Sequence, residues 1–319
     1  MGRGTFRSQN KVGETMSFQT DSSSATTFDP TVTFLPGLSD RVSWDLGDGS
    51  GYVADSSLSY SYDDTGTTKT VTLRTNKLSN LYGVLFNFDN LVGDLDFSGW
   101  DNMGGSFNAT SNPKLTGITH TTSTEGFYYY NAQSCNLIGN HDMSMFPNLG
   151  GTFLLGSNSE LTGVTHTAST QVFSNYQIQT CNLIGNHDVS MFPNLGGVFF
   201  VYSNPLLTSI THPVSTQTFS LYRAYSCNLD YVDFLPLSGA SITGDIQLQD
   251  NSMSVTDVNH ILVDFDNIST NLNPSGWTGT TLNISGTNAA PDSSSGGFDG
   301  IAALSSLTGG TNNWTITTS

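Results

Sequence analysis

Apolar residues recur at a fixed spacing through the middle of the chain, and each group of them surrounds one Asn or Cys. Around Cys181 the apolar positions are Phe173, Tyr176, Ile178 and Leu183. The same frame returns 23 residues earlier around Asn158 and 23 residues later around Asn204. A fixed period of this size indicates stacked supersecondary units that share one continuous core.

Two such coils make a longer repeat of 46 residues. The segment Ser134–Gly151 returns almost unchanged as Thr180–Gly197, and the three cysteines keep the same spacing. In register, the Asn or Cys position of successive coils reads Asn112, Cys135, Asn158, Cys181, Asn204 and Cys227. A further coil with slipped spacing fits around Asn251, and a weaker, earlier one fits around Asp89.

The frame resembles the leucine-rich-repeat consensus, L-x-x-L-x-L-x-x-N/C-x-L, over six coils that keep register without a gap. The chain departs from that consensus in its aromatic strand positions, and the GNH triplet at Gly139–His141 is missing after Cys227. The resemblance implies a solenoid over residues 76–253, with residues 76–103 supplying its first coil and covering its apolar end. The resemblance does not identify a ligand.

Ahead of the repeats, residues 16–75 alternate apolar and polar positions in period two, which predicts short strands joined by turns. The turn WDLGDGSG at Trp44–Gly51 and the strands within Tyr60–Thr75 resemble the PKD type of immunoglobulin-like domain. That resemblance implies a β-sandwich used as a spacer or binding module. Residues 1–15 carry no pattern and are expected to be a disordered arm.

Behind the repeats, residues 254–319 are expected to form a small α+β cap. One helical face carries Val255, Val258, Ile261, Leu262, Phe265 and Ile268. Ser254 and Asp257 resemble a capping box at the start of that helix. A strand, a short helix and a last strand follow, and this tail resembles the segments that close repeat arrays in bacteriophage structural and tail proteins. The expected fold class is therefore mainly β: a sandwich, a solenoid with coils of 23 residues, and the cap.

Composition narrows the partners of this chain. It has 319 residues, 11% of them charged, and a net charge of −17. Arg223 is the only basic residue after Lys114, so the repeats offer no basic patch for nucleic acid or an anionic membrane.

No apolar run is long enough to cross a bilayer. The N-terminal segment also lacks the apolar centre of a secretory signal. Either the protein leaves its cell by another route, or a signal is missing from this sequence.

The cysteines are predicted to be free, buried thiols. Equivalent positions two coils apart lie about 9–10 Å apart, since neighbouring strands are about 4.8 Å apart. A disulfide needs Cα atoms closer than about 7 Å. Free thiols fit folding in a reducing cytoplasm.

Metal and catalytic sites receive little support. Shifting the sequence by one coil aligns the histidines of the two GNHD segments, His141 and His187, with apolar residues, which places them at the core. Calcium at Asp45, Asp48 or Asp55 stays open, although the frame of an EF-hand is absent. The chain has no nucleophile elbow, P-loop or zinc-protease motif. We therefore expect no enzyme activity, no cofactor and no metal ion.

The polar side of each predicted strand carries the candidate binding residues. Four aromatic and cationic residues gather on two adjacent coils, namely Phe200, Tyr202, Arg223 and Tyr225. Other aromatic and amide residues of this face are Tyr129, Asn131, Gln133, Asn175, Gln177 and Gln179. Such side chains suit a sugar or protein surface. The alternative is that aromatic ladders only stabilise the stacked strands.

The expected function is that of a non-enzymatic structural or adhesion protein of a bacteriophage virion, assembled in the host cytoplasm. Its expected partners are other virion proteins or a glycan or protein of the host surface, and self-association is left open. A bacterial cell-surface leucine-rich-repeat adhesin is the alternative, with an extracellular location. A polysaccharide-acting enzyme remains as a third class, because β-solenoids can carry such sites.

Overall fold

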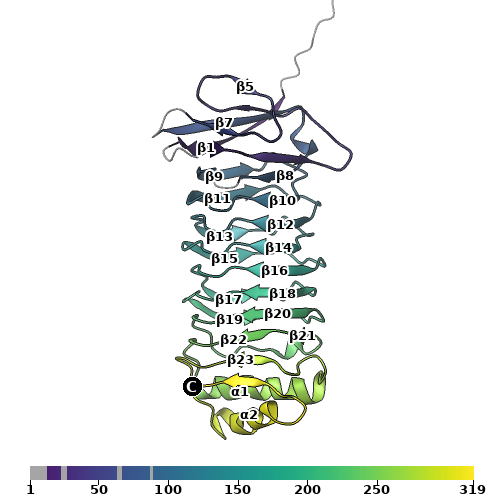
Figure 1. Cartoon of the computed structure of the whole chain (residues 1–319), viewed down its shortest axis with the longest axis vertical. Coiled ribbons are helices and arrows are strands. Elements are labelled where there is room, and N and C mark those ends of the chain that lie inside the picture. The colour runs from purple at the N-terminus through teal and green to yellow at the C-terminus, as the bar shows by residue number, and fades with distance from the viewer. Residues whose placement is uncertain (1–12, 23–26, 63–66, 87–88) are drawn as a thin grey trace, which may run out of the picture.

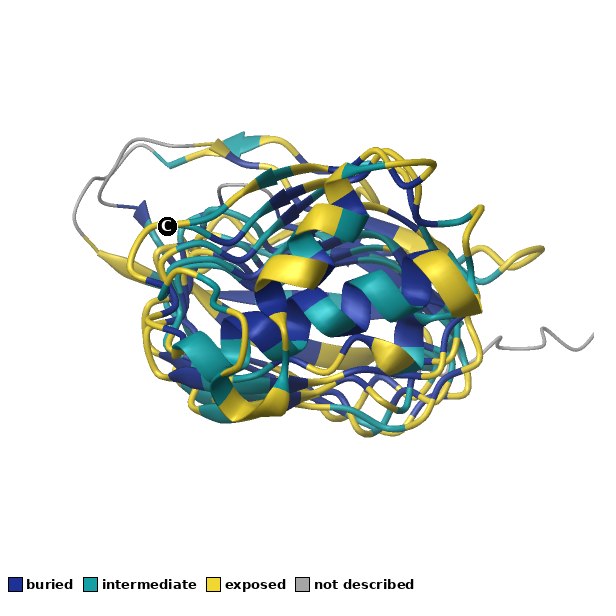
Figure 2. Cartoon of the chain, turned by 90° about the horizontal axis from the view of Figure 1, so that it is seen from below, coloured by how far each residue is buried: buried dark blue, intermediate teal, exposed yellow. Residues whose placement is uncertain are grey.

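A computed structural model describes residues 13–22, 27–62, 67–86 and 89–319 of the chain. The predicted solenoid is confirmed: the central part is a β-solenoid of about 7 turns, each of about 23 residues. Its coils stack along the long axis of the molecule (Figure 1). Seen along that axis, buried residues gather inside the coils and most exposed residues lie on the outer turns (Figure 2). The core is therefore one continuous column.

One wall of the solenoid is a long sheet that runs through every coil. Its solenoid strands are parallel, and each lies next to the strand of the following coil. In order they are β8 (Leu81–Leu85), β10 (Gly105–Asn108), β12 (Phe127–Asn131), β14 (Gly151–Leu154), β16 (Phe173–Gln177), β18 (Leu195–Phe200), β20 (Thr218–Arg223), β22 (Asp245–Gln247), β23 (Thr281–Asn283) and β24 (Thr315–Thr317). The short strand β21 (Ser241–Ile242) also pairs with β20.

The opposite wall is built from separate strand pairs, of which the first belongs to a six-stranded sheet and the other two are two-stranded sheets. The pairs are β9 (Leu91–Phe97) with β11 (Lys114–His120), β13 (Gly139–Asp142) with β15 (Leu161–Thr165), and β17 (Gly185–Asp188) with β19 (Leu207–Thr211). The two walls therefore differ, because only one of them is a continuous sheet.

The N-terminal strands extend both walls. In one sheet β1 (Glu14–Asp21) pairs with β9 and with β7 (Thr68–Thr75), and the order continues through β4 (Ser43–Asp45) to β5 (Tyr52–Val53). In the long sheet β3 (Thr31–Phe34) pairs with β8. The remaining strands, β2 (Thr27–Phe28) and β6 (Tyr60–Ser61), pair with each other. These strands close the first end of the solenoid.

Residues 13–75 and the first coil share one core. The Phe18 ring lies 5.0 Å from the ring of Phe86, and Trp44 is fully buried. The Trp44 indole donates a hydrogen bond to the Asp55 carbonyl at 2.8 Å. The PKD-type sandwich over residues 16–75 stays a prediction. Most of the arm predicted over residues 1–15 lies outside the described residues, and β1 begins at Glu14.

An asparagine in every second coil ties neighbouring coils together. The Asn158 Oδ1 atom accepts from the backbone N–H of Leu137 in the preceding coil at 3.0 Å. Its amide nitrogen donates to the carbonyls of Ala132 in that coil and Leu155 in its own. Asn112, Asn204 and Asn251 make the same kinds of contact. The backbone N–H and carbonyl groups at this turn are buried and cannot bond to water, so the asparagine amide supplies their hydrogen-bond partners.

The cysteines occupy the same position in the alternate coils. Cys135 and Cys181 are buried and Cys227 is partly buried, all three as free thiols, which agrees with the sequence prediction. The Cys135 Sγ atom lies 3.0 Å from the carbonyl oxygen of Ala109, and the other two thiols repeat this contact. Burial raises the pKa of each thiol to about 11.

Aromatic rings stack through the core of the long sheet. One inward position per coil carries, in order, Phe107, Tyr130, Phe153, Tyr176, Phe199 and Tyr222. Successive ring centroids lie between 4.8 and 5.7 Å apart, and each pair is stacked. Because parallel strands stay in register, equal positions of neighbouring coils must meet in this way.

The second end of the core is covered by α1 (Val255–Asn267), which begins at the Ser254–Asp257 capping box that the sequence predicts. Phe265 on its buried face contacts Phe234, at 4.6 Å between ring centroids. A short helix, α2 (Gly300–Thr308), packs beyond it, and β23 and β24 lengthen the long sheet. Asn288 makes the same kinds of hydrogen bond as Asn158 and its equivalents. The sequence did not reveal this, because α1 is inserted between the coils.

We predict that Asn158→Ala lowers the free energy of unfolding by about 3 kcal/mol, because it leaves buried backbone groups without partners. Asn158→Cys should cost less, since the neighbouring coils already carry Cys there. Ser144→Ala is the control: its side chain is exposed in the same repeat, and its effect should stay within about 0.5 kcal/mol. Denaturant titration measures all three. Equal effects of Asn158→Ala and Ser144→Ala would contradict the stabilising role of the repeated asparagine.

We also predict that Cys135 and Cys181 resist alkylation in the folded protein. Their thiols are buried and their pKa values are raised to about 11, so little thiolate forms at neutral pH. Mass spectrometry after iodoacetamide treatment, with and without denaturant, measures this. Rapid native labelling of either residue would show that its coil is open.

Candidate functional site

The histidines that suggested a metal site lie in the core, as the sequence predicts. His120, His141, His187 and His212 are buried, and His166 is partly buried. The Tyr130 hydroxyl lies between two imidazoles, 2.9 Å from His120 Nε2 and 2.8 Å from His141 Nε2. Tyr176 repeats this arrangement with His166 and His187, and Tyr222 contacts His212. Each pair of coils therefore encloses one tyrosine–histidine cluster.

Burial keeps these histidines neutral. It lowers the pKa of His141, His187 and His212 to about 4, and those of His120 and His166 fall well below their usual value for the same reason. Across the described ranges, no group of three or more His, Cys, Asp or Glu could hold a metal ion. The clusters give each buried tyrosine hydroxyl of the stack a partner, while the Nδ1 atoms of His120 and His166 have none among the described residues.

The acidic turn considered for calcium uses its carboxylates locally. Asp45, Asp48 and Asp55 each accept a hydrogen bond from the backbone N–H two residues ahead. Asp48 also accepts from the Tyr60 hydroxyl, and its hydrogen bonds to Ser50 and Tyr60 lower its pKa to about 2. These contacts are those of turn-forming aspartates.

The outward face of the long sheet brings together the four predicted residues Phe200, Tyr202, Arg223 and Tyr225, here called the arginine–tyrosine strip. Phe200 of β18 pairs directly with Arg223 of β20. The Arg223 guanidinium carbon lies 4.9 Å from the centre of the Phe200 ring. Tyr202 and Tyr225 stack with centroids 4.5 Å apart and planes 5° from parallel. The register predicted for these two pairs is confirmed.

The strip leaves part of its hydrogen-bonding capacity unused. Among the described residues the buried Arg223 Nε atom has no hydrogen-bond partner. The pKa of Tyr225 is raised, first by burial and then by the neighbouring Tyr202, while Arg223 opposes the shift. In this stack Tyr202 and Tyr225 each cover one face of the other ring. The strip therefore suits hydrogen bonding better than stacking of a sugar.

Amide side chains lie on both sides of the strip. Gln177 pairs with Phe200, and Gln247 pairs with Arg223 from the other side. In the described part of the chain, the buried oxygens of Gln179 and Gln249 have no hydrogen-bond partner. These two residues stand next to Tyr202 and Tyr225 along the stack, one coil before and one coil after. Both oxygens are buried, so they lie inside the stack of coils.

The remaining predicted residues are not part of this strip. Gln177 donates its amide N–H to Asn175 Oδ1 at 2.7 Å, so these two side chains bond to each other. Tyr129, Asn131 and Gln133 belong to the coil of β12, which β14 separates from β16. Asn131 is only 6% exposed and donates to the Tyr129 hydroxyl at 3.0 Å. Tyr129 pairs with Ser106 and Thr152 and not with another aromatic residue, and the binding role of this end stays a prediction.

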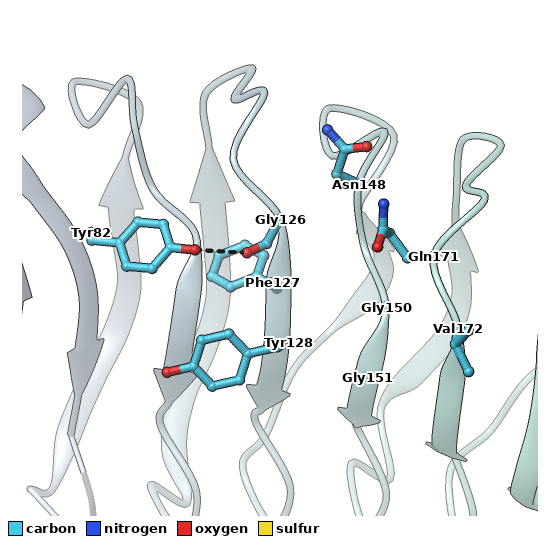
Figure 3. A pocket seen from close by; sticks show the side chains of 9 residues that line it. All are labelled: Tyr82, Gly126, Phe127, Tyr128, Asn148, Gly150, Gly151, Gln171 and Val172. Carbon is cyan, nitrogen blue, oxygen red and sulfur yellow. Dashed lines mark hydrogen bonds between the residues drawn. The ribbon is translucent and has the colours of Figure 1, made fainter. Parts of the chain in front are cut away.

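A groove opens beside the N-terminal ends of β12, β14 and β16 (Figure 3). The sequence patterns did not reveal it. We call it the glycine groove, and its volume is about 560 Å³. It is lined by Tyr82, Gly126, Phe127, Tyr128, Asn148, Gly150, Gly151, Gln171 and Val172. The signal for it was the Gly–Gly pair that recurs at 46-residue spacing, at Gly104–Gly105, Gly150–Gly151 and Gly196–Gly197.

Comparisons with known proteins assign no family: no family profile, curated protein or solved structure matches the chain. Among the helices of the described residues, none is long and apolar enough to span a membrane.

We predict that the protein loses stability as the pH falls from about 6.5 to about 4. In this window the unfolded histidines bind protons, while burial keeps those of the folded state neutral, so protonation favours unfolding. Asp89 and Asp264 act in the opposite direction, because burial raises the pKa of both, that of Asp89 to about 8, but they are two groups against five histidines.

Denaturant titrations at about pH 7.5 and about pH 5 measure the difference. A free energy of unfolding that is constant or higher at the lower pH would contradict the histidine assignment.

Proposed function

We propose that this chain is a non-enzymatic binding and spacer protein that uses the arginine–tyrosine strip to hold an acidic partner. The observation that carries the proposal is the stacking of Arg223 on Phe200, beside the Tyr202–Tyr225 pair. Arg223 is the only basic residue after Lys114 in a chain of net charge −17. A carboxylate of a glycan or of a protein loop is the group that such a guanidinium binds most strongly.

The scaffold supports a role as a spacer. A long hydrogen-bonded sheet passes from β3 to β24, and both ends of the core are covered. The repeated asparagine contacts support the leucine-rich-repeat interpretation of residues 76–253. The antiparallel strands around the buried Trp44 support the PKD-type interpretation of residues 16–75. A solenoid of this kind holds its outer face at a fixed distance from whatever anchors its ends.

The proposed setting is the virion of a bacteriophage, where the protein contacts a host-surface glycan or protein or a neighbouring virion protein. The resemblance of the C-terminal tail to phage structural proteins and the free thiols support this setting. A bacterial cell-surface adhesin would use the same strip. Immunogold labelling of purified virions and of whole cells distinguishes the two locations.

We predict that Arg223→Gln weakens binding to acidic oligosaccharides by about tenfold or more, because a charge-assisted hydrogen bond is worth about 1.5–3 kcal/mol. Gln stands at this position in the following coil, as Gln247, and two coils earlier, as Gln177, so the stack should keep its stability. An array of sialylated, uronic-acid and neutral oligosaccharides provides the measurement.

Arg41→Gln is the matched control, since it removes an exposed cation from the N-terminal strands. Its binding should equal that of the unchanged protein. If Arg223→Gln lowers the free energy of unfolding while binding stays the same, the strip is only a structural ladder and the proposal fails.

A further inference from the structure

The glycine groove repeats a position that a tyrosine ring occupies one repeat earlier. In the first repeat the ring of Tyr82 lies across Gly104 and Gly105. A Cβ atom added to Gly105 would stand 2.2 Å from the Tyr82 Cε1 atom, and one added to Gly104 would stand 3.0 Å from Cε2. The ring therefore covers both glycines. Its hydroxyl donates to the Gly126 carbonyl at 3.4 Å.

In the second repeat the corresponding glycines are not covered by a ring. Tyr128 stands 46 residues after Tyr82, but its ring points back toward Tyr82 and away from Gly150 and Gly151 (Figure 3). A Cβ atom on Gly151 would meet the backbone of Tyr128, at 2.2 Å from its carbonyl oxygen, and no atom of its ring is among the nearest neighbours. The result is a ring-sized groove with a backbone floor and an aromatic side.

The groove presents unused polar groups beside an exposed aromatic ring. The Tyr128 side chain is 63% exposed. Asn148 donates its amide to the Thr124 carbonyl at 2.8 Å, which leaves its Oδ1 atom as an acceptor. The Gln171 side chain is exposed and makes no hydrogen bond to another described residue. In the next repeat the equivalent Gln217 donates instead to Asn194, at 3.4 Å.

The chemistry of the lining selects the ligand. Its side chains are aromatic, aliphatic and amide, and none of them carries a charge. With a net charge of −17 and no lining cation, the protein disfavours an anionic ligand here. A volume of about 560 Å³ lies within the range of small-molecule sites. A ring with an apolar face and several hydroxyls would match the tyrosine and both amides.

We propose that the glycine groove binds one neutral sugar ring, with its apolar face against Tyr128 and its hydroxyls bonded to Asn148 and Gln171. This site is separate from the arginine–tyrosine strip, which lies on the coils of β18 and β20 and suits an acidic partner. A polysaccharide chain that contains neutral residues is the source of such a ring. The proposal holds or fails independently of the function assigned to the strip.

The test uses the full chain and simple probes, namely the methyl glycosides of glucose, galactose, mannose and N-acetylglucosamine, with methyl glucuronide as the charged comparison. Saturation-transfer NMR detects binding, and titration gives the affinity. At least one neutral glycoside should bind at about 10 mM, which is roughly ten times the Kd of a weak millimolar site. The glucuronide should bind less.

Variants then place the bound sugar. Tyr128→Ala should lower the affinity by about fivefold or more, since an aromatic contact of this kind is worth about 1 kcal/mol or more. Tyr128→Phe should stay within a few-fold of the unchanged protein, because it keeps the ring. Gln171→Ala should weaken binding, whereas Gln217→Ala, the matched change one repeat later, should not. Each position except Gln217 is exposed, and unfolding midpoints check that the fold is intact.

Three results would overturn the proposal. These are the absence of binding by every neutral probe, a Tyr128→Ala variant that binds as well as the unchanged protein, or an equal loss from Gln171→Ala and Gln217→Ala. None of these results depends on Arg223, so they leave the role of the strip to its own test.

Discussion

Satisfaction of buried backbone groups at the turn between the two walls is the constraint on which the solenoid depends. At this turn the residue before each repeated Asn or Cys has a positive φ, as in Ser157 (61°) and Thr180 (56°). The polar groups around it lie inside the core. An amide with two donors and an acceptor can serve two coils at once, whereas a thiol serves one carbonyl. The alternation of Asn and Cys therefore gives every second coil a strong cross-link and leaves the others with a smaller apolar side chain.

The two periods of the sequence have different physical causes. The 23-residue period is geometric, since it is the length of one coil. The 46-residue period is chemical, because each buried tyrosine of the aromatic stack needs a partner for its hydroxyl, and the histidines of adjacent coils supply it. A phenylalanine in the next coil needs no partner. The near-identity of Ser134–Gly151 and Thr180–Gly197 thus reflects a repeated polar contact within the core.

Much of this fold could be predicted because parallel, in-register strands bring equal positions together. That rule alone places Arg223 on Phe200 and Tyr202 on Tyr225. It fails where the chain leaves the period, so the coil containing Asn288 was hidden behind α1, and the pairing of β1 with β9 was not foreseen. The glycine groove depends on the direction of one side chain, Tyr128, and a rotamer leaves no trace in a repeat pattern.

The difference between the two walls gives the molecule an unequal mechanical character. Strands run across the long axis, so the hydrogen bonds between them run along it. In the long sheet these bonds pass without a break from β8 to β24. In the described residues of the opposite wall the regular pairing of strands is interrupted between β11 and β13 and again between β15 and β17. Backbone hydrogen bonds still cross each gap, from Asn136 and Ile138 to β11 and from Asn182 and Ile184 to β15. A pull along the axis is therefore carried mainly by the long sheet, and the solenoid bends most easily by widening the two gaps in the opposite wall, where the strand ladder is interrupted.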